Sequence, residues 1–238
     1  MAQTILHLSQ TRGLGDHGWL KSHHTFSFGG YYNPERINFG ALRVLNDDTV
    51  SGGMGFGEHP HDNMEIISIP LEGKLQHKDS MGNVAGIEAG EIQVMSAGTG
   101  IYHSEYNAEK DKTVKFLQIW LFPNQRNVEP RYDQKRLNDL MKENEFVQIL
   151  SPNANDEGVW IYQDAWFNLG NFKMDTTTNY HLHKTGNGVY IFVINGNVEI
   201  DGQKLENRDG FGIWDTENFE LKISANSTVL LMEVPMEF

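Results

Sequence analysis

Two pairs of metal-ligand side chains, each pair two residues apart, constrain the fold of this chain most strongly. His59 and His61 precede a largely apolar run at 66–71, and His103 and Glu105 follow a glycine-rich turn. Side chains two residues apart project from the same face of a β-strand. We therefore predict that the two pairs lie on neighbouring strands, joined by a meander, and converge on one point inside a β-barrel.

Neutral imidazole and ionised carboxylate are ligands that borderline divalent ions accept. A single His-x-His pair on a strand is more often a surface pair or a hydrogen-bonded structural pair than a metal site, but here a second pair supplies the missing ligands. The sequence therefore predicts one metal site, formed by His59, His61, His103 and Glu105. This ligand chemistry leaves iron, nickel, manganese, copper(II) and zinc as alternatives.

Three further residues near these motifs have open roles. Glu65 has the same strand parity as His59 and His61, so it is a ligand, a hydrogen-bond partner of an imidazole or an acid facing the cavity. His23 and His24 precede aromatic residues at 25–32, which we expect to cover one end or edge of the barrel. The spacing does not place either histidine at the metal.

Composition excludes several classes of function. The 238 residues include 19 Lys and Arg against 32 Asp and Glu, a net charge of -13. This charge argues against nucleic acid or an anionic membrane as a direct partner. The chain has no cysteine, which excludes disulfides, thiolate ligands and cysteine nucleophiles. No apolar run reaches membrane-spanning length and the start is too polar for a signal peptide, so we expect a cytoplasmic protein.

The patterning predicts an all-β fold. Glycine occurs 24 times, and the dipeptides Asn195-Gly196 and Asp201-Gly202 suit hairpin turns. The segment 114–122 alternates apolar residues on both faces and is expected to lie between two sheets. Residues 1–39 look irregular, and 123–150 is the best linker candidate, with a short helix expected at 138–146.

The two halves of the chain resemble a diverged duplication. His181-Leu182-His183 corresponds to His59-Pro60-His61, segment 189–196 to 67–73, and 229–234 to 117–122. Where the first half carries His103 and Glu105, the second carries Phe219 and Leu221 or their neighbours. We therefore expect two barrels and a metal site in the first barrel alone.

Several motifs, in order, resemble the pirin family of the cupin superfamily. They are His23-His24-Thr25-Phe26-Ser27-Phe28, His59-Pro60-His61, Asp79-Ser80-Met81-Gly82-Asn83, and Ser96-Ala97-Gly98-Thr99-Gly100-Ile101 followed by His103-Ser104-Glu105. The resemblance extends from residue 15 to about 137. It implies a bicupin, an all-β protein of two tandem cupin-type β-barrels with a few short helices. Residues 1–130 would form the metal-binding domain, and 131–238 a degenerate cupin domain without metal.

The resemblance also implies an activity. Pirin-type proteins bind one metal, usually iron, through residues matching His59, His61, His103 and Glu105, whereas the residue matching Glu65 is not normally a ligand. Bacterial members can show quercetin 2,3-dioxygenase activity, in which O₂ opens the flavonol ring and carbon monoxide leaves. We therefore expect a metal-dependent dioxygenase that acts on a flavonol, with Glu105 as the catalytic base.

Two other classes of function fit the same motifs. One is a metal-binding regulatory protein that acts on a protein partner, because pirins in nuclei are cofactors of transcription regulators. The other is a metal-dependent isomerase or hydrolase, which would not consume O₂. The fold alone cannot choose among these, because cupins support many chemistries.

Overall fold

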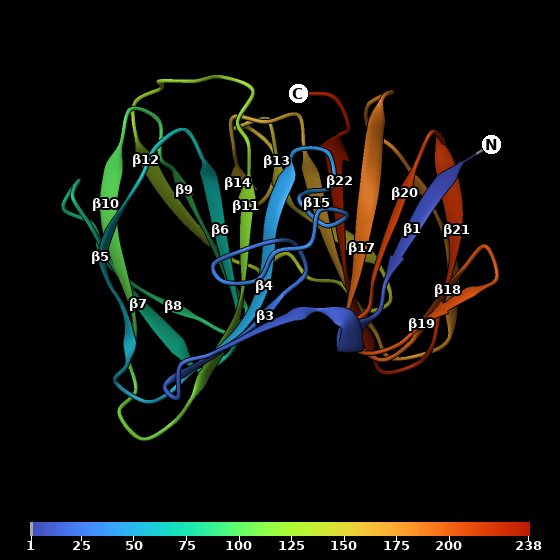
Figure 1. Ribbon diagram of the computed structural model, residues 1–238. Coiled ribbons are helices and arrows are strands. Elements are labelled where there is room, and N and C mark those ends of the chain that lie inside the picture. Colours follow the sequence, from blue (N-terminus) through green and yellow to red (C-terminus); the bar gives the residue numbers. More distant parts are fainter. Residues whose placement is uncertain (1) are drawn as a thin grey trace.

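The computed structural model describes residues 2–238, which form two β-barrels side by side (Figure 1). Each barrel pairs a seven-stranded sheet with a four-stranded sheet. The described residues contain no α-helix, and the short 3₁₀ helix η1 spans Ser9–Thr11. The all-β, two-barrel architecture is thus confirmed. The expectation of a helix at 138–146 is wrong. Only a single turn forms there, in which the Leu140 and Met141 amides donate to the Leu137 carbonyl.

The N-terminal barrel contains eleven of the strands. They are β2 (Gly13–Asp16), β3 (Leu20–His24), β4 (Leu42–Val50), β5 (Gly55–His61), β6 (Glu65–Glu72), β7 (Lys74–Asp79), β8 (Val84–Glu88), β9 (Glu91–Ser96), β10 (Ile101–Asn107), β11 (Val114–Leu121) and β12 (Arg131–Arg136). The larger sheet follows the order β12-β9-β6-β11-β4-β3-β2, and the smaller sheet the order β5-β10-β7-β8.

The C-terminal barrel repeats this plan. Its strands are β1 (Gln3–His7), β13 (Phe146–Ser151), β14 (Val159–Trp160), β15 (Trp166–Phe172), β16 (Thr176–His181), β17 (Asn187–Asn195), β18 (Val198–Ile200), β19 (Gln203–Leu205), β20 (Gly210–Trp214), β21 (Asn218–Ile223) and β22 (Ser227–Pro235). Their orders are β1-β20-β17-β22-β15-β13-β14 and β16-β21-β18-β19. The strands β17 and β22 occupy the positions of β6 and β11, which agrees with an internal duplication.

Two strands at sheet edges depart from the expected organisation. β1 pairs with β20 of the C-terminal barrel, and β12 pairs with β9 of the N-terminal barrel. The expectation that residues 1–39 are irregular is therefore wrong, since this segment contains β1, β2 and β3. The linker reading is wrong for 131–136, where the charged side chains belong to an edge strand with exposed positions. The division at residue 130 stays a prediction.

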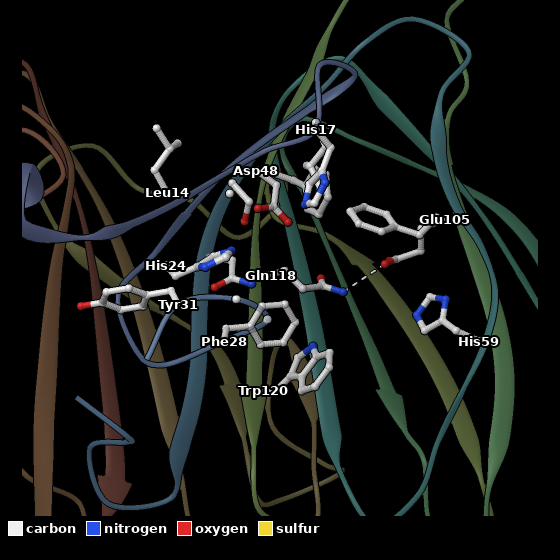
Figure 2. A pocket seen from close by; sticks show the side chains of 18 of the residues that line it. Leu14, His17, His24, Phe28, Tyr31, Asp48, His59, Glu105, Gln118 and Trp120 are labelled. Carbon is white, nitrogen blue, oxygen red and sulfur yellow. Dashed lines mark hydrogen bonds between the residues drawn. The ribbon is translucent and has the colours of Figure 1, made fainter. Parts of the chain in front are cut away.

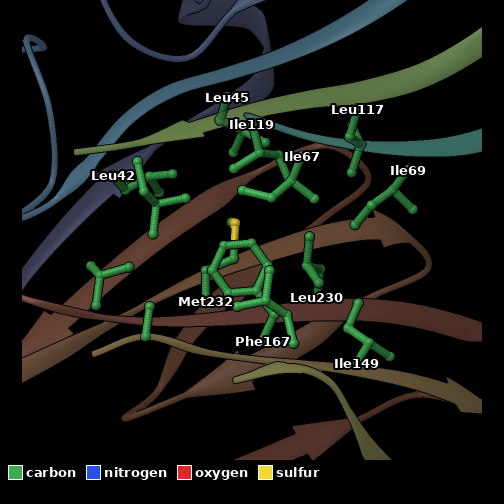
Figure 3. Packing of buried hydrophobic residues seen from close by; sticks show 14 of the residues in the cluster. Leu42, Leu45, Ile67, Ile69, Leu117, Ile119, Ile149, Phe167, Leu230 and Met232 are labelled. Atoms are coloured by element: carbon green, nitrogen blue, oxygen red, sulfur yellow. The ribbon is translucent and has the colours of Figure 1, made fainter. Parts of the chain in front are cut away.

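Strand β11 lies between β4 and β6 and is buried on both faces, as expected for 114–122. Its side chains Leu117, Ile119 and Leu121 belong to the core shared by the two large sheets. Figure 3 shows this core, where residues of β4, β6 and β11 meet Ile149 and Phe167 of the C-terminal barrel. The alternate side chains of β11 face the interior of the N-terminal barrel.

Glu65 begins β6 and shares a face with Ile67 and Ile69 of the shared core. Its side chain is buried and accepts a hydrogen bond from Ser96 Oγ at 2.7 Å. The expectation that Glu65 projects to the same side as His59 and His61 is therefore wrong. A turn that contains Asn63 at φ 45° separates β5 from β6, so the alternation of side chains does not continue from one strand to the next. Glu65 faces the contact between the barrels and does not face the candidate metal site.

Among residues 2–238, no helix is long and apolar enough to cross a membrane.

Removal of the Phe167 ring tests the shared core. The ring is fully buried between the two large sheets, so Phe167→Ala should lower the free energy of unfolding by about 3–5 kcal/mol, because it leaves a cavity. Urea unfolding measures this loss. The control Thr177→Ala alters an exposed position on β16 and should stay within about 0.5 kcal/mol of the wild type. A loss below about 1 kcal/mol for Phe167→Ala would contradict this description of the core.

Glu65→Gln tests the buried carboxyl group. Burial raises the pKa of Glu65 from 4.5 to about 7, so the folded state binds the proton more tightly than the unfolded state. Stability from this group is present below the unfolded pKa and is lost as pH rises through the folded pKa. The stability of Glu65→Gln relative to the wild type should therefore increase by about 3 kcal/mol between about pH 4.5 and about pH 8. Urea unfolding of the two chelator-treated proteins at each pH measures this difference in the free energy of unfolding. A difference that stays constant with pH would contradict the prediction.

Candidate metal centre

Strands β5 and β10 are hydrogen-bonded neighbours, and His59 lies opposite His103 in their antiparallel register. The predicted meander between them is wrong, because the intervening chain crosses to the opposite sheet as β6, returns as β7 and β8, and crosses again as β9. The two ligand pairs still meet because both strands belong to the smaller sheet. Gly98 and Gly100 adopt φ values of 48° and 130° in the turn before β10.

Three imidazoles converge on the inner face of these strands. The ring centroids of His59 and His103 lie 4.4 Å apart, and that of His61 lies 4.9 Å from each of them. One ring nitrogen from each histidine lies within 4.8 Å of those of the other two. The structure therefore brings the three histidines of the expected ligand set together.

Glu105 joins this site through His103. Its carboxylate forms a second close group with His103 and His77, again with ligand atoms within 4.8 Å of one another. A register shift lies between His103 and Glu105 where β10 pairs with β5. Because His103 belongs to both groups, the other three expected ligands lie around its imidazole.

His77 is a site residue that the sequence reasoning missed. It is fully buried on β7, opposite Glu105 on β10. Its Nε2 lies 3.1 Å from Asp79 Oδ2, and Asp79 lies opposite His103. The available signal was the alternation His77-x-Asp79, which repeats the spacing of the other two pairs.

The imidazoles have free nitrogen atoms and suit a cation. Neither ring nitrogen of His103, nor Nε2 of His61, has a hydrogen-bond partner in the protein. Burial lowers the pKa of His61 to about 4 and that of His103 to about 2, so both rings are neutral with available lone pairs. His59 Nδ1 lies 2.7 Å from the Gly57 carbonyl. Donation from this nitrogen leaves His59 Nε2 free to bind a metal.

Two side chains from the opposite sheet hold the Glu105 carboxylate. Ser68 Oγ donates to Oε1 at 3.1 Å, and Gln118 Nε2 donates to Oε2 at 3.0 Å. Burial raises the pKa of Glu105 to about 7, although both hydrogen bonds favour the ionised form. A bound cation would favour the ionised form further. The residues present therefore fit a divalent metal ion.

The site opens onto a cavity of about 590 Å³ inside the N-terminal barrel. His59 and Glu105 lie at one end, and the aromatic rings of Phe28 and Trp120 form part of the wall (Figure 2). His61, whose ring is next to that of His59, also lines the cavity. This volume lies within the range of pockets that enclose small organic molecules. The aromatic segment expected only to cover the barrel therefore also shapes the cavity.

His23 and His24 project from opposite faces of β3. His24 lines the cavity and is buried, with its ring 5.3 Å from that of Phe28. His23 is half-buried on the opposite face of β3, and both burial and nearby Arg12 lower its pKa. Of the two, His24 faces the candidate site.

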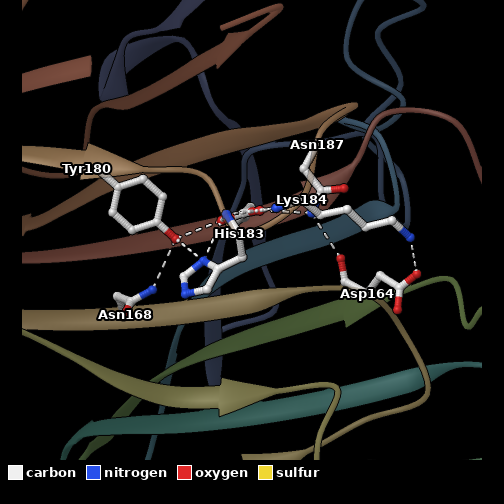
Figure 4. A network of polar contacts seen from close by, with 7 residues as sticks. Asp164, Asn168, Tyr180, His183, Lys184 and Asn187 are labelled. Atoms are coloured by element: carbon white, nitrogen blue, oxygen red, sulfur yellow. Dashed lines mark hydrogen bonds and ion pairs between the residues drawn. The ribbon is translucent and has the colours of Figure 1, made fainter. Parts of the chain in front are cut away.

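The C-terminal barrel has an apolar interior. Phe219, Leu221 and Ile223 are buried on β21, the strand equivalent to β10. His181 is exposed, and His183 Nδ1 lies 2.8 Å from Glu233 Oε2. Figure 4 shows the surrounding network, in which the Tyr180 hydroxyl and the Asn187 amide also donate to Glu233. In this structure His183 therefore has a structural partner.

Comparisons with known proteins agree with this description. A family model for pirin matches residues 7–121, and one for the quercetinase C-terminal cupin domain matches 148–234. A quercetin 2,3-dioxygenase from Escherichia coli strain K12 is 43% identical over 230 residues, which are 97% of this chain and 98% of that protein. A pirin-like protein from Caulobacter vibrioides is 39% identical over 222 residues, 93% of this chain and 95% of that protein.

A solved structure extends the similarity to three dimensions. The bacterial pirin YhhW from Escherichia coli, in complex with nickel(II), has a TM-score of 0.92 at 40% identity, covering 98% of this chain and 99% of that chain. The sequence motifs, the two-barrel fold, the His/Glu group and these relatives all agree. The chain belongs to the pirin family.

Proposed function

We propose that this protein is a metal-dependent dioxygenase that opens the ring of flavonols such as quercetin with O₂. The observation that carries the proposal is the convergence of three imidazoles and a buried carboxylate at one end of an aromatic-walled cavity. The relatives named quercetin 2,3-dioxygenase support this substrate class.

The proposed ligands of the single metal ion are His59, His61, His103 and Glu105. Iron(II) is the ion that the family resemblance favours; manganese, copper(II) and zinc also suit the ligand set, and nickel(II) is present in the solved Escherichia coli pirin. When bound, such an ion supplies Lewis acidity that favours the deprotonated form of a chelating hydroxyl and orients the substrate for reaction with O₂.

The protein contributes a base and a shaped cavity. Glu105 is the proposed acceptor of the proton from the substrate hydroxyl, because its carboxylate belongs to the proposed ligand set and lines the cavity. Gln118 and Ser68 fix the position of that carboxylate. The Phe28 and Trp120 rings offer apolar surfaces to a flat aromatic substrate and limit water in the cavity.

A regulatory role with a protein partner is the second candidate. The net charge of -13 suits a partner protein with a basic surface better than nucleic acid. Tyr102 and Tyr106 are exposed on the outer face of β10, the strand that carries His103 and Glu105. Metal-dependent recovery of a stoichiometric partner in a pull-down would favour this candidate. The cytoplasmic location stays a prediction.

His103→Ala tests the ligand set. His103 belongs to both close groups, so its loss should lower bound metal at least about tenfold and abolish flavonol turnover. Elemental analysis of purified protein and an assay of flavonol consumption measure the two effects. The matched control His181→Ala removes an exposed histidine of the other barrel and should change neither. Turnover that survives complete loss of metal would contradict the mechanism.

O₂ uptake with quercetin tests the reaction. Metal-reconstituted protein should consume O₂ and bleach the flavonol, and chelator-treated protein should do neither. Glu105→Gln should reduce uptake by about 10²–10⁴-fold, because an amide cannot accept the hydroxyl proton; elemental analysis shows whether this variant retains metal. Absence of uptake with every reconstituted divalent ion would favour the regulatory candidate.

A further inference from the structure

The cavity contains buried polar atoms that the metal site does not use. Asn46 and Asp48 lie two residues apart on β4, so both face the cavity, and they are only 3% and 4% exposed. Asn46 Oδ1, Asp48 Oδ1 and His24 Nδ1 have no hydrogen-bond partner in the protein. Buried polar atoms usually have partners, because an unmade hydrogen bond costs stability. Three such atoms in one cavity wall indicate a place for a polar ligand.

These atoms lie away from the metal ligands. Figure 2 shows Asp48 and His24 on one side of the cavity and His59 and Glu105 on the other, with Gln118 between them. The strand register agrees with this view, because Asn46 pairs with His24 on one side and with Gln118 on the other. Gln118 reaches Glu105. A ligand that spans the cavity would therefore contact both ends.

The geometry of Asp48 leaves one oxygen for a ligand. Ser22 lies opposite Asp48 on β3, and both side chains line the cavity. The Oδ1 atom of Asp48 has no hydrogen-bond partner in the protein. Burial raises the pKa of Asp48 to about 7, and hydroxyl donors from a ligand would stabilise its ionised form.

We propose that Asp48 and Asn46 anchor the substrate by accepting hydrogen bonds from hydroxyl groups on a ring remote from the metal. Both unpartnered oxygens are acceptors, so the complementary ligand carries O–H donors. The volume of about 590 Å³ admits more than one ring, and the aromatic wall suits a flat molecule. The inference rests on the proposed function and names its substrate class more closely: flavonols with hydroxyl groups beyond the metal-chelating one.

Anaerobic binding separates this anchor from catalysis. Dissociation constants of metal-reconstituted protein are measured by tryptophan fluorescence or calorimetry for quercetin, galangin, fisetin and 3-hydroxyflavone. Galangin lacks the hydroxyls of the pendant ring, fisetin lacks one on the fused ring, and 3-hydroxyflavone keeps only the chelating hydroxyl. The variants are Asp48→Asn and Asp48→Leu. The control is Glu65→Gln, which changes an equally buried carboxyl group outside the cavity.

The wild type should bind quercetin more tightly than 3-hydroxyflavone, and both Asp48 variants should reduce this preference by about tenfold or more. Glu65→Gln should keep it, and galangin and fisetin identify the ring that is bound. An unchanged preference in a folded Asp48 variant, or equal weakening for both ligands, would overturn the anchor.

Turnover under O₂ is then compared with binding. Binding that depends on Asp48 without any turnover would refute the dioxygenase and keep the anchor. Turnover with the same flavonol preference in all variants would refute the anchor and keep the dioxygenase.

Discussion

The two faces of β11 divide the molecule into a packed core and a cavity that leads to the candidate metal site. Leu117, Ile119 and Leu121 pack against the other barrel, while Phe116, Gln118 and Trp120 line the cavity. Side chains alternate strictly along a strand, so neither face can shift without the other. The C-terminal barrel therefore contributes to the metal centre indirectly, because it fixes the sheet from which Gln118 reaches Glu105.

The two barrels use the same topology in different ways. Apolar side chains fill the second barrel, and its buried Glu233 accepts several hydrogen bonds. In the first barrel, ring nitrogens of His61 and His103 and an oxygen of Asp48 have no partner in the protein. Such groups cost stability unless a ligand satisfies them. After duplication, one barrel thus fits a structural role and the other a binding role.

Several errors of the sequence-based prediction have one cause, which is that local patterns do not report strand pairing. The charged segment 131–136 resembles a linker, but pairing with β9 makes it an edge strand. Glu65 has the parity of the histidine pair, but the turn at Asn63 places it on the other face of the barrel wall. His77 and Asp48 became visible as site residues only when neighbouring strands brought them to the cavity or to Glu105.

The sequence by itself determined the all-β class, and it predicted the four proposed ligands, because a period of two is a local property of a strand. It also placed the apolar strand 114–122 between two sheets. Only the tertiary structure decided that the chain crosses between two sheets on its way from β5 to β10, that Ser68 and Gln118 hold Glu105, and that Asn46 and Asp48 face the opposite end of the cavity. These relations depend on contacts between strands far apart in the chain, which no local spacing encodes.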